Sequence, residues 1–504
     1  MDPVEPNIDP ILTAATNGLG MSMAWRMTNQ GFTGVASNAS YDQWSPARQY
    51  SLYHRGARLL TETASARLAS PVEVPFERLG ASRGYNAKEQ TWNLPSPWIG
   101  GMWTYGDIVR YQTAASWALF IQAAENRGAW LEGYANMAER ALGKLPAWGR
   151  DPWPSAYVIP RAQRDSLATQ RMIWMLQHGQ VEVHETTAPV TIDGVTHPAR
   201  SWIVPLQQPF GGYAKTLLER QKYPNLFDYP GGPPKRPYDV TAHTLPLLLG
   251  VEAIAVTGSV PPHGAPVAAV REPALKTPIT TGIKRLALYK RSTQGNMDEG
   301  WTRWVLEQHN VPYTRVTEAD ITSGALAQYE ALILPDQPAG QLNQALGAAG
   351  VAALDAFVSG GGTLLAFNDA SDFAIGALKL PVKNALDGVP ATDFYAPGSI
   401  IAVQVDRTHS LARFYNPPVT GVWFEGSPAF EITDPAAASA VLSYQSSGEP
   451  LLSGWLLGGA KLYNRAAMVD VKKAQGRVVL YGFRPQYRGQ PNSTFNLIWS
   501  AIAR

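Results

Sequence analysis

The feature that most constrains this chain is the alternation of apolar strands with amphipathic helices in its C-terminal part. Short apolar runs at 285–289, 329–334 and 362–367 are separated by segments of helical periodicity at 299–309 and 351–358. Strands that alternate with helices at this spacing form a parallel sheet, joined by right-handed crossovers. The pattern therefore predicts an α/β domain in which helices cover a parallel sheet.

The limits of this domain follow from the composition on either side. After Ala391 the pattern becomes rich in strands, and a last strand at 477–481 precedes a last helix at 494–502. We therefore expect residues 283–504 to form a flavodoxin-like three-layer domain with a β-rich insertion. Residues 257–282 hold five prolines among small residues with no sustained period, which predicts an extended linker.

The residues before the linker divide into two parts. Residues 1–143 show a helical pattern near the start and a short apolar run from Leu59, which we expect to end a buried strand. Thr104 and Asp107 have the spacing of a helix-capping box. We expect these residues to form one α/β unit.

Residues 144–256 are expected to form a small α/β module. The apolar run at 156–160 predicts a strand, 166–176 a helix, and Asp193-Gly194 lies where a hairpin turn would join two strands.

Composition excludes several classes of function. The formal charge is +2, without a dense basic cluster, so binding to nucleic acid has no electrostatic support. No apolar run reaches the ~18 residues that span a bilayer, and the first residues lack the basic and apolar regions of a signal peptide. We therefore expect no membrane partner and, for the chain as given, a cytoplasmic location.

Metal and nucleotide motifs are also missing from the sequence. The eight histidines show no His-x-x-x-His, His-x-x-Glu or His-Glu-x-x-His spacing, and there is no phosphate-binding glycine loop. The absence of cysteine excludes disulfides, thiolate metal sites and cysteine nucleophiles. We predict no metal site in this chain.

The segment 41–66 holds the residues of greatest chemical interest. Glu62 is a single acid in an uncharged run at the end of the expected strand, where desolvation raises the pKa of a carboxyl and suits it to general-base chemistry. A strand-end glutamate with its hydrogen bonds satisfied is the alternative. Tyr41 supplies a hydroxyl 21 residues upstream.

Longer strings carry a family resemblance. Tyr41-Asp-Gln-Trp-Ser-Pro-Ala-Arg48, Leu60-Thr-Glu-Thr-Ala-Ser65 and the Trp/Pro-rich stretch after them resemble the C-terminal half of the catalytic domain in large bacterial zinc carboxypeptidases of the carboxypeptidase A type. The resemblance continues through 229–243, Asn296-Met-Asp-Glu-Gly-Trp-Thr-Arg-Trp304 and Leu334-Pro-Asp-Gln337, and covers essentially the whole chain.

The resemblance implies roles for two residues. It makes Glu62 the general base that activates zinc-bound water and Tyr41 a hydroxyl that hydrogen-bonds the terminal region of a peptide substrate. It also implies zinc as cofactor, release of C-terminal amino acids as activity, export from the cytoplasm, and a class I glutamine-amidotransferase-like domain at 283–504.

The chain departs from this family at two places. The zinc ligands, a His-x-x-Glu pair and a later His, belong to the half of the catalytic domain that precedes the matched segment, so we expect no zinc on this chain. Amidotransferases use a cysteine at a strand-to-helix turn; here Asn368 and Asp369 follow the third strand at that place. We expect these two residues to bind a ligand, without glutamine hydrolysis.

Two hypotheses follow. The chain is an incomplete zinc carboxypeptidase, catalytic only with its metal-binding half, or it is a non-catalytic peptide-binding or scaffold protein.

Overall fold

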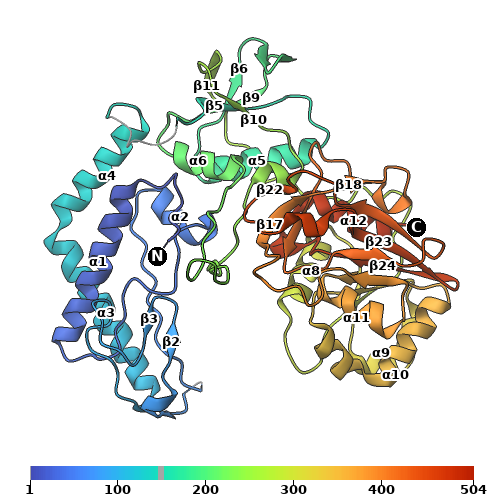
Figure 1. Ribbon diagram of the computed structural model, residues 1–504. Helices are drawn as coiled ribbons and strands as arrows, with labels where there is room; N and C mark the ends of the chain where they lie inside the picture. Colours follow the sequence, from blue (N-terminus) through green and yellow to red (C-terminus); the bar gives the residue numbers. More distant parts are fainter. Residues whose placement is uncertain (1, 68, 146–151) are drawn as a thin grey trace. The chain divides into compact units, whose positions relative to one another are not determined.

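The computed structural model describes residues 2–67, 69–145 and 152–504 and confirms a mixed α/β protein (Figure 1). The chain divides into two compact units. Unit 1 comprises Met1–Ser155, Gly179–Val181 and Pro205–Leu217, and unit 2 comprises Ala156–His178, Glu182–Val204 and Leu218–Arg504. Within the described residues, no helix has both the length and the apolar character that crossing a bilayer requires.

The C-terminal domain of unit 2 contains the expected parallel sheet. Its strands are β12 (Leu286–Tyr289), β13 (Thr314–Val316), β14 (Ala331–Leu334), β15 (Thr363–Phe367) and β24 (Gly476–Tyr481), in the spatial order β13-β12-β14-β15-β24. All four pairings between them are parallel. In chain order this is 2-1-3-4-5, which confirms the flavodoxin-like arrangement.

Alternate residues along each strand enter two separate hydrophobic clusters, one on each face of the sheet. Leu286, Ile333 and Leu365 lie in the first cluster, whereas Ala287, Leu332 and Leu364 lie in the second. The first cluster contains residues of α8 (Met297–Gln308) and α12 (Asn492–Ile502); the second contains residues of α9 (Glu318–Thr322), α10 (Ala339–Ser359) and α11 (Asp369–Ala377). Burial on both faces explains why these strands are continuous apolar runs.

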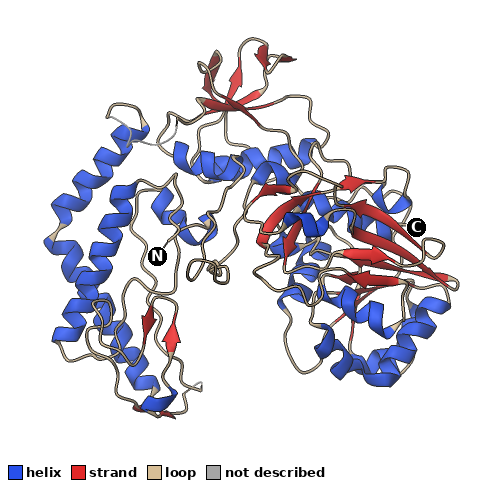
Figure 2. Cartoon of the chain, viewed as in Figure 1, coloured by secondary structure: helices blue, strands red, loops and turns tan. Residues whose placement is uncertain are grey.

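The expected β-rich insertion lies between α11 and β24. It consists of β16 (Val382–Asn384), β17 (Pro397–Ala402), β18 (Gln404–Val405), β19 (Gly421–Glu425), β20 (Phe430–Ile432), β21 (Ala438–Ser443), β22 (Leu451–Ser453) and β23 (Ala466–Lys473). β23 extends the main sheet by pairing antiparallel with β24, while β19, β17 and β22 form a separate sheet. Figure 2 shows this concentration of strands.

The small module has a five-stranded sheet in the order β10-β5-β9-β6-β11. In the chain, α5 (Ser166–His178) lies between β5 and β6. Its strands are β5 (Ala156–Ile159), β6 (His184–Thr186), β9 (Trp202–Pro205), β10 (Ile254–Val256) and β11 (His263–Pro266). The hairpin of β7 (Val190–Ile192) and β8 (Val195–His197) turns at Asp193-Gly194 as predicted. Between β9 and β10 the chain forms two short helices. These are α6 (Gly211–Leu218), which belongs to unit 1 up to Leu217, and α7 (Leu245–Leu249) of unit 2.

The segment 257–282, expected to be an extended linker, contributes a strand to the small module's sheet in its first half. β11 pairs antiparallel with β6, and the backbone N–H of Val267 donates to the carbonyl of Val183. The sheet of the small module had an open edge, and an extended proline-rich segment can fill an edge position because fewer donors are required there. From 271 to 282 the chain has no helix or strand longer than an isolated bridge.

Unit 1 is mainly helical. It contains α1 (Pro10–Asn29), α2 (Pro46–Tyr53), α3 (Tyr105–Glu125) and α4 (Arg127–Ala141), with two short antiparallel strand pairs, β1 (Val72–Val74) with β4 (Gly101–Trp103) and β2 (Ala81–Ser82) with β3 (Tyr85–Asn86). Leu19, Met23 and Met27 of α1 pack against Ala115 and Ala118 of α3. The predicted capping box of Thr104 and Asp107 is present at the start of α3.

The strand expected from Leu59 is absent. Residues 57–66 form neither helix nor strand, and no neighbouring strand among the described residues pairs with them. Side chains satisfy part of this backbone instead: the indole Nε1 of Trp103 donates to the carbonyl of Ala64 at 2.8 Å, and Gln112 of α3 donates to the carbonyl of Thr61 at 3.3 Å. An extended apolar run without a partner strand does not form a sheet.

Candidate functional site

Tyr41 and Glu62 line one cavity in unit 1. The cavity has a volume of about 560 Å³, and its wall also includes Met23, Trp98 and Trp103. Its size falls within the range of small-molecule and short-peptide sites, and its lining combines apolar surface with a few polar groups, as such sites do. The structure thus brings together the two residues that the resemblance implicated.

Glu62 does not lie in the environment that the sequence predicted. Its side chain is exposed, in a segment without regular structure, so the desolvation expected at the end of a buried strand is absent. Gln112 holds the flanking residues, since its amide oxygen accepts from Thr61 Oγ1 at 2.9 Å and its nitrogen donates to Thr63 Oγ1 at 3.2 Å. Tyr41 is half-buried, in an irregular segment across the cavity wall.

A second site lies in unit 2, at the carboxyl ends of the parallel strands. Asn368 stands between β15 and α11, with φ 52° and ψ −121°. This conformation is sparsely populated for residues other than glycine and costs free energy, although asparagine tolerates positive φ better than most. The chain therefore makes a sharp elbow exactly where a parallel α/β sheet places its ligands.

Asp336 holds the elbow in place from the end of the neighbouring strand β14. Its Oδ1 accepts two hydrogen bonds of 3.1 Å, one from Asn368 Nδ2 and one from the backbone N–H of Asp369. Asn368 Nδ2 also donates to Asp369 Oδ1 at 3.1 Å. Asn368 is buried, with 1% of its surface exposed.

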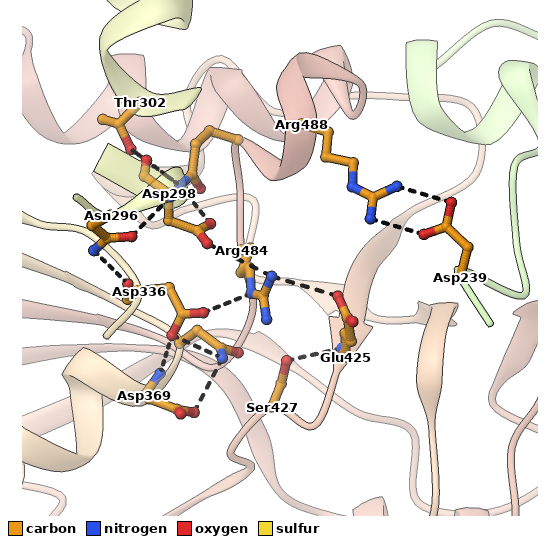
Figure 3. Close-up of polar contacts among 12 residues, drawn as sticks. Asp239, Asn296, Asp298, Thr302, Asp336, Asp369, Glu425, Ser427, Arg484 and Arg488 are labelled. Atoms are coloured by element: carbon orange, nitrogen blue, oxygen red, sulfur yellow. Dashed lines mark hydrogen bonds and ion pairs between the residues drawn. The ribbon is translucent and has the colours of Figure 1, made fainter. Parts of the chain in front are cut away.

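Arg484, which follows β24, connects this elbow with two further acids (Figure 3). Its Nε lies 2.8 Å from Asp336 Oδ2, and its Nη1 lies 3.5 Å from Glu425 Oε2 and 3.7 Å from Asp298 Oδ2. One guanidinium therefore faces three carboxylates, with Asp369 as a fourth beside Asp336. We call Asp298, Asp336, Asn368, Asp369, Glu425 and Arg484 the elbow cluster.

Burial favours the protonated form of two carboxyls in the elbow cluster, those of Asp298 and Asp369. Burial raises the pKa of Asp298 to about 7, with the charges of Asp336 and Glu425 adding to it and that of Arg484 opposing it. Burial likewise raises the pKa of Asp369 to about 6, again with help from Asp336. Burial alone would lower the pKa of Arg484, but the surrounding carboxylates outweigh it and raise that pKa.

The chemistry of these sites does not fit a zinc centre. Within the part of the chain that the structure describes, no three His, Asp or Glu side chains converge as metal ligands. In the elbow cluster the guanidinium of Arg484 lies between Asp298, Asp336 and Glu425, where a metal ion that bridged these three acids would have to sit. An asparagine at the elbow also supplies no nucleophile for acyl transfer.

Sequence reasoning found Asn368 and Asp369 but missed Asp298, Asp336, Glu425 and Arg484. Asp336 and Arg484 could have been found, because each follows a predicted strand of the parallel sheet within three residues. Glu425 comes from an antiparallel strand of the insertion and Asp298 from the first turn of α8. No spacing in the sequence relates these two to the others.

Comparison with known proteins gives no family for the chain. No family model matches it, and no curated protein does. Similar solved structures include the cytoplasmic protein STM3548 from Salmonella typhimurium, with 12% identity and a TM-score of 0.30 over 44% of this chain and 100% of that one. A ThuA-like protein from Bacteroides uniformis shows 11% identity and a TM-score of 0.29 over 43% of this chain and 91% of its own.

A β-galactosidase from Bacillus circulans is also similar, with 11% identity and a TM-score of 0.27, over 42% of this chain and 29% of the enzyme. At such TM-scores these likenesses carry no argument about function.

Proposed function

We propose that the chain is the peptide-binding portion of a metallocarboxypeptidase of the carboxypeptidase A type, and that unit 1 corresponds to the part of the catalytic domain that contacts substrate. The observation that carries this proposal is the convergence of Tyr41 and Glu62, 21 residues apart in sequence, on one cavity of about 560 Å³. The apolar wall formed by Met23, Trp98 and Trp103 suits a hydrophobic C-terminal side chain.

The surface of residues 2–143 supports the same proposal. Most of the large apolar side chains that are exposed in the described chain belong to this stretch, among them Trp117 at 64%, Phe120 at 63% and Leu131 at 71% exposed. A complete catalytic domain of the α/β type would bury such side chains against a sheet, and among the described residues unit 1 has only two-stranded pairings.

The residues of this chain would bind and orient a peptide. Tyr41 offers a hydroxyl to the terminal region of the peptide, and Glu62 offers a carboxylate near its scissile bond. Zinc would supply an activated water when bound, but the described residues do not fit a zinc site.

Peptide binding is the direct test. Isothermal titration calorimetry of the whole chain with an N-blocked dipeptide ending in phenylalanine is expected to show one site. Tyr41→Phe is expected to weaken binding about fivefold, since one hydrogen bond contributes about 1 kcal/mol net. Tyr105→Phe, at an exposed tyrosine that does not line the cavity, is the matched control and should leave the affinity unchanged. Equal effects of both variants, or no binding, would refute the proposal.

The exposed position of Glu62 favours a second candidate, a peptide-binding protein without catalysis. Release of phenylalanine from the same dipeptide, measured with Zn²⁺ on the chain supplemented with a metal-binding half of the carboxypeptidase A type, separates the two. Release that Glu62→Gln abolishes and Glu77→Gln leaves intact supports the peptidase, whereas binding without release supports the second candidate.

A further inference from the structure

At pH 8, above the pKa values of Asp298 and Asp369, the elbow cluster carries an excess of negative charge. Four carboxylates, from Asp298, Asp336, Asp369 and Glu425, accompany the one guanidinium of Arg484. The guanidinium is already paired with three of them, and their negative charge offsets its attraction for an anionic ligand. An anion placed here would meet mostly carboxylates, and a cation would be attracted.

Two buried amide groups leave acceptors open in the same place. Asn368 gives its Nδ2 to Asp336 and Asp369, while its Oδ1 is buried and accepts no hydrogen bond. Gln486, with no exposed surface, gives its Nε2 to Thr302 at 3.1 Å and to Asp298 Oδ1 at 3.4 Å, and its Oε1 also accepts none. A buried acceptor without a donor is costly, so each such atom in a native protein calls for a donor.

The kind of cation follows from the remaining groups. Within the described residues, no three acids or histidines are placed to hold a metal ion. The open acceptor is an amide oxygen beside carboxylate oxygens, a set that suits an N–H donor carrying a positive charge. A primary ammonium group has three donors and no acceptor, and so matches Asn368 Oδ1 together with Asp369.

We propose that the elbow cluster binds a ligand through a primary ammonium group, which donates to Asn368 Oδ1 and pairs with the carboxylate of Asp369. Asp369 is half-buried and the side chain of Glu425 is 34% exposed, so solvent reaches these two carboxylates, whereas Asn368 Oδ1 lies buried beneath the surface. The site is separate from the cavity of Tyr41 and Glu62, and its test does not depend on the function proposed for that cavity.

Binding is expected to depend on pH. The ionisable groups around the site are Asp298 from α8, Asp336 after β14, Asp369 and Asp372 from α11, Glu425 from β19, and Arg484 and Arg488 after β24. The arginines stay charged. Asp369 has a pKa of about 6, so it is about one-tenth ionised at pH 5 and almost fully ionised at pH 8. The affinity for n-butylamine, whose primary ammonium group stays charged over this range, should therefore rise about tenfold between these pH values.

Ligand-observed NMR titration of the whole chain tests the proposal. The probes are n-butylamine, which carries an aliphatic ammonium group like that of lysine, and glycinamide, which carries an α-ammonium group like that of a peptide N-terminus. Butyrate and n-butanol are the anionic and neutral controls. We expect at least one amine to bind, neither control to bind, and the preferred amine to identify the source of the ammonium group.

Three variants locate the site. Asn368→Gly removes the amide and keeps a residue that accepts φ 52°, and Asp369→Asn removes the charge; each is expected to weaken amine binding at least fivefold. Asp372→Asn is the matched control, because Asp372 lies on the same helix with its pKa raised to a similar value, but its carboxylate accepts from Asn384 at 3.0 Å instead. It should change the affinity less than twofold.

Circular dichroism and thermal unfolding of each variant establish that it folds. Binding of neither amine, equal binding of butanol, equal losses in Asp369→Asn and Asp372→Asn, or an affinity independent of pH would each overturn the proposal. Water alone would then be the donor to Asn368.

Discussion

Replacing Asp298 by asparagine should make the stability of the C-terminal domain less dependent on pH. Asp298 lies in the first turn of α8, where an ionised carboxylate is normally favourable. Here burial dominates and raises its pKa from 3.8 to about 7. At about 1.4 kcal/mol per pKa unit, the ionised side chain costs the folded state on the order of 4 kcal/mol.

The direction follows from proton binding. Because the folded state holds the proton more tightly than the unfolded state, the contribution of Asp298 to stability is fully present below pH 3.8 and is lost as the pH rises through about 7. Between pH 5 and pH 8 this loss amounts to about 3 kcal/mol. Asparagine has a similar shape and does not ionise, so Asp298→Asn should lack this part of the loss.

Urea unfolding at pH 5 and pH 8 measures the effect, followed by pulsed hydrogen exchange in peptides that contain β14 and β15, which report on the C-terminal domain alone. The free energy of unfolding of the unsubstituted chain should fall by about 3 kcal/mol more than that of Asp298→Asn. Asp434→Asn, at an exposed acid of the same domain, is the control and should follow the unsubstituted chain. Parallel pH profiles for Asp298→Asn and the unsubstituted chain would show that the ion pair with Arg484 outweighs burial, and the reasoning would fail.

Two further predictions concern packing and the chain between domains. Leu365→Ala should destabilise the C-terminal domain by about 3 kcal/mol in the same urea assay, because Leu365 is fully buried at the centre of the parallel sheet and its loss leaves a cavity; a loss below about 1 kcal/mol would contradict the fold. Limited digestion with elastase should cleave after Ala274 before it cleaves after Ala268, since the backbone near β11 is bonded to β6 while 271–282 has no helix or strand; fragment masses reveal the order, and early cleavage at Ala268 would contradict it.

The parallel sheet could be predicted because its determinants are local. β12 and β14 are apolar along their whole length, β15 is apolar after Thr363 and β24 after Arg477, and each is followed or preceded by a helix of the right period. The capping box at Thr104 and the Asp193-Gly194 turn are likewise short patterns with one structural outcome. The run from Leu59 has a strand-like composition, but strand formation requires a partner, and the sequence of the run does not contain that information.

The candidate sites were predictable to a smaller extent. The topology places Asn368 and Asp369 at the carboxyl edge of the sheet, so two strand-end residues could be chosen from the pattern alone. The charges that define their chemistry come from Asp298, Glu425 and Arg484, which are separated by up to 186 residues and meet only in the folded domain. The pKa values of Asp298 and Asp369 depend on this convergence of charged side chains and on burial. A local window of sequence determines neither.

Stability and ligand binding at the elbow cluster are coupled through the same carboxyls. Raising the pH ionises Asp298 and Asp369 against the cost of burial, which weakens the folded domain when no ligand is present. The same ionisation creates the negative charge that attracts an ammonium group. A ligand that binds only the folded state adds stability in proportion to the logarithm of its concentration relative to its dissociation constant. The stabilisation that an amine gives should therefore be greatest at the alkaline pH at which the free domain is least stable. If the cluster had a purely structural role, an amine would add no stability at any pH.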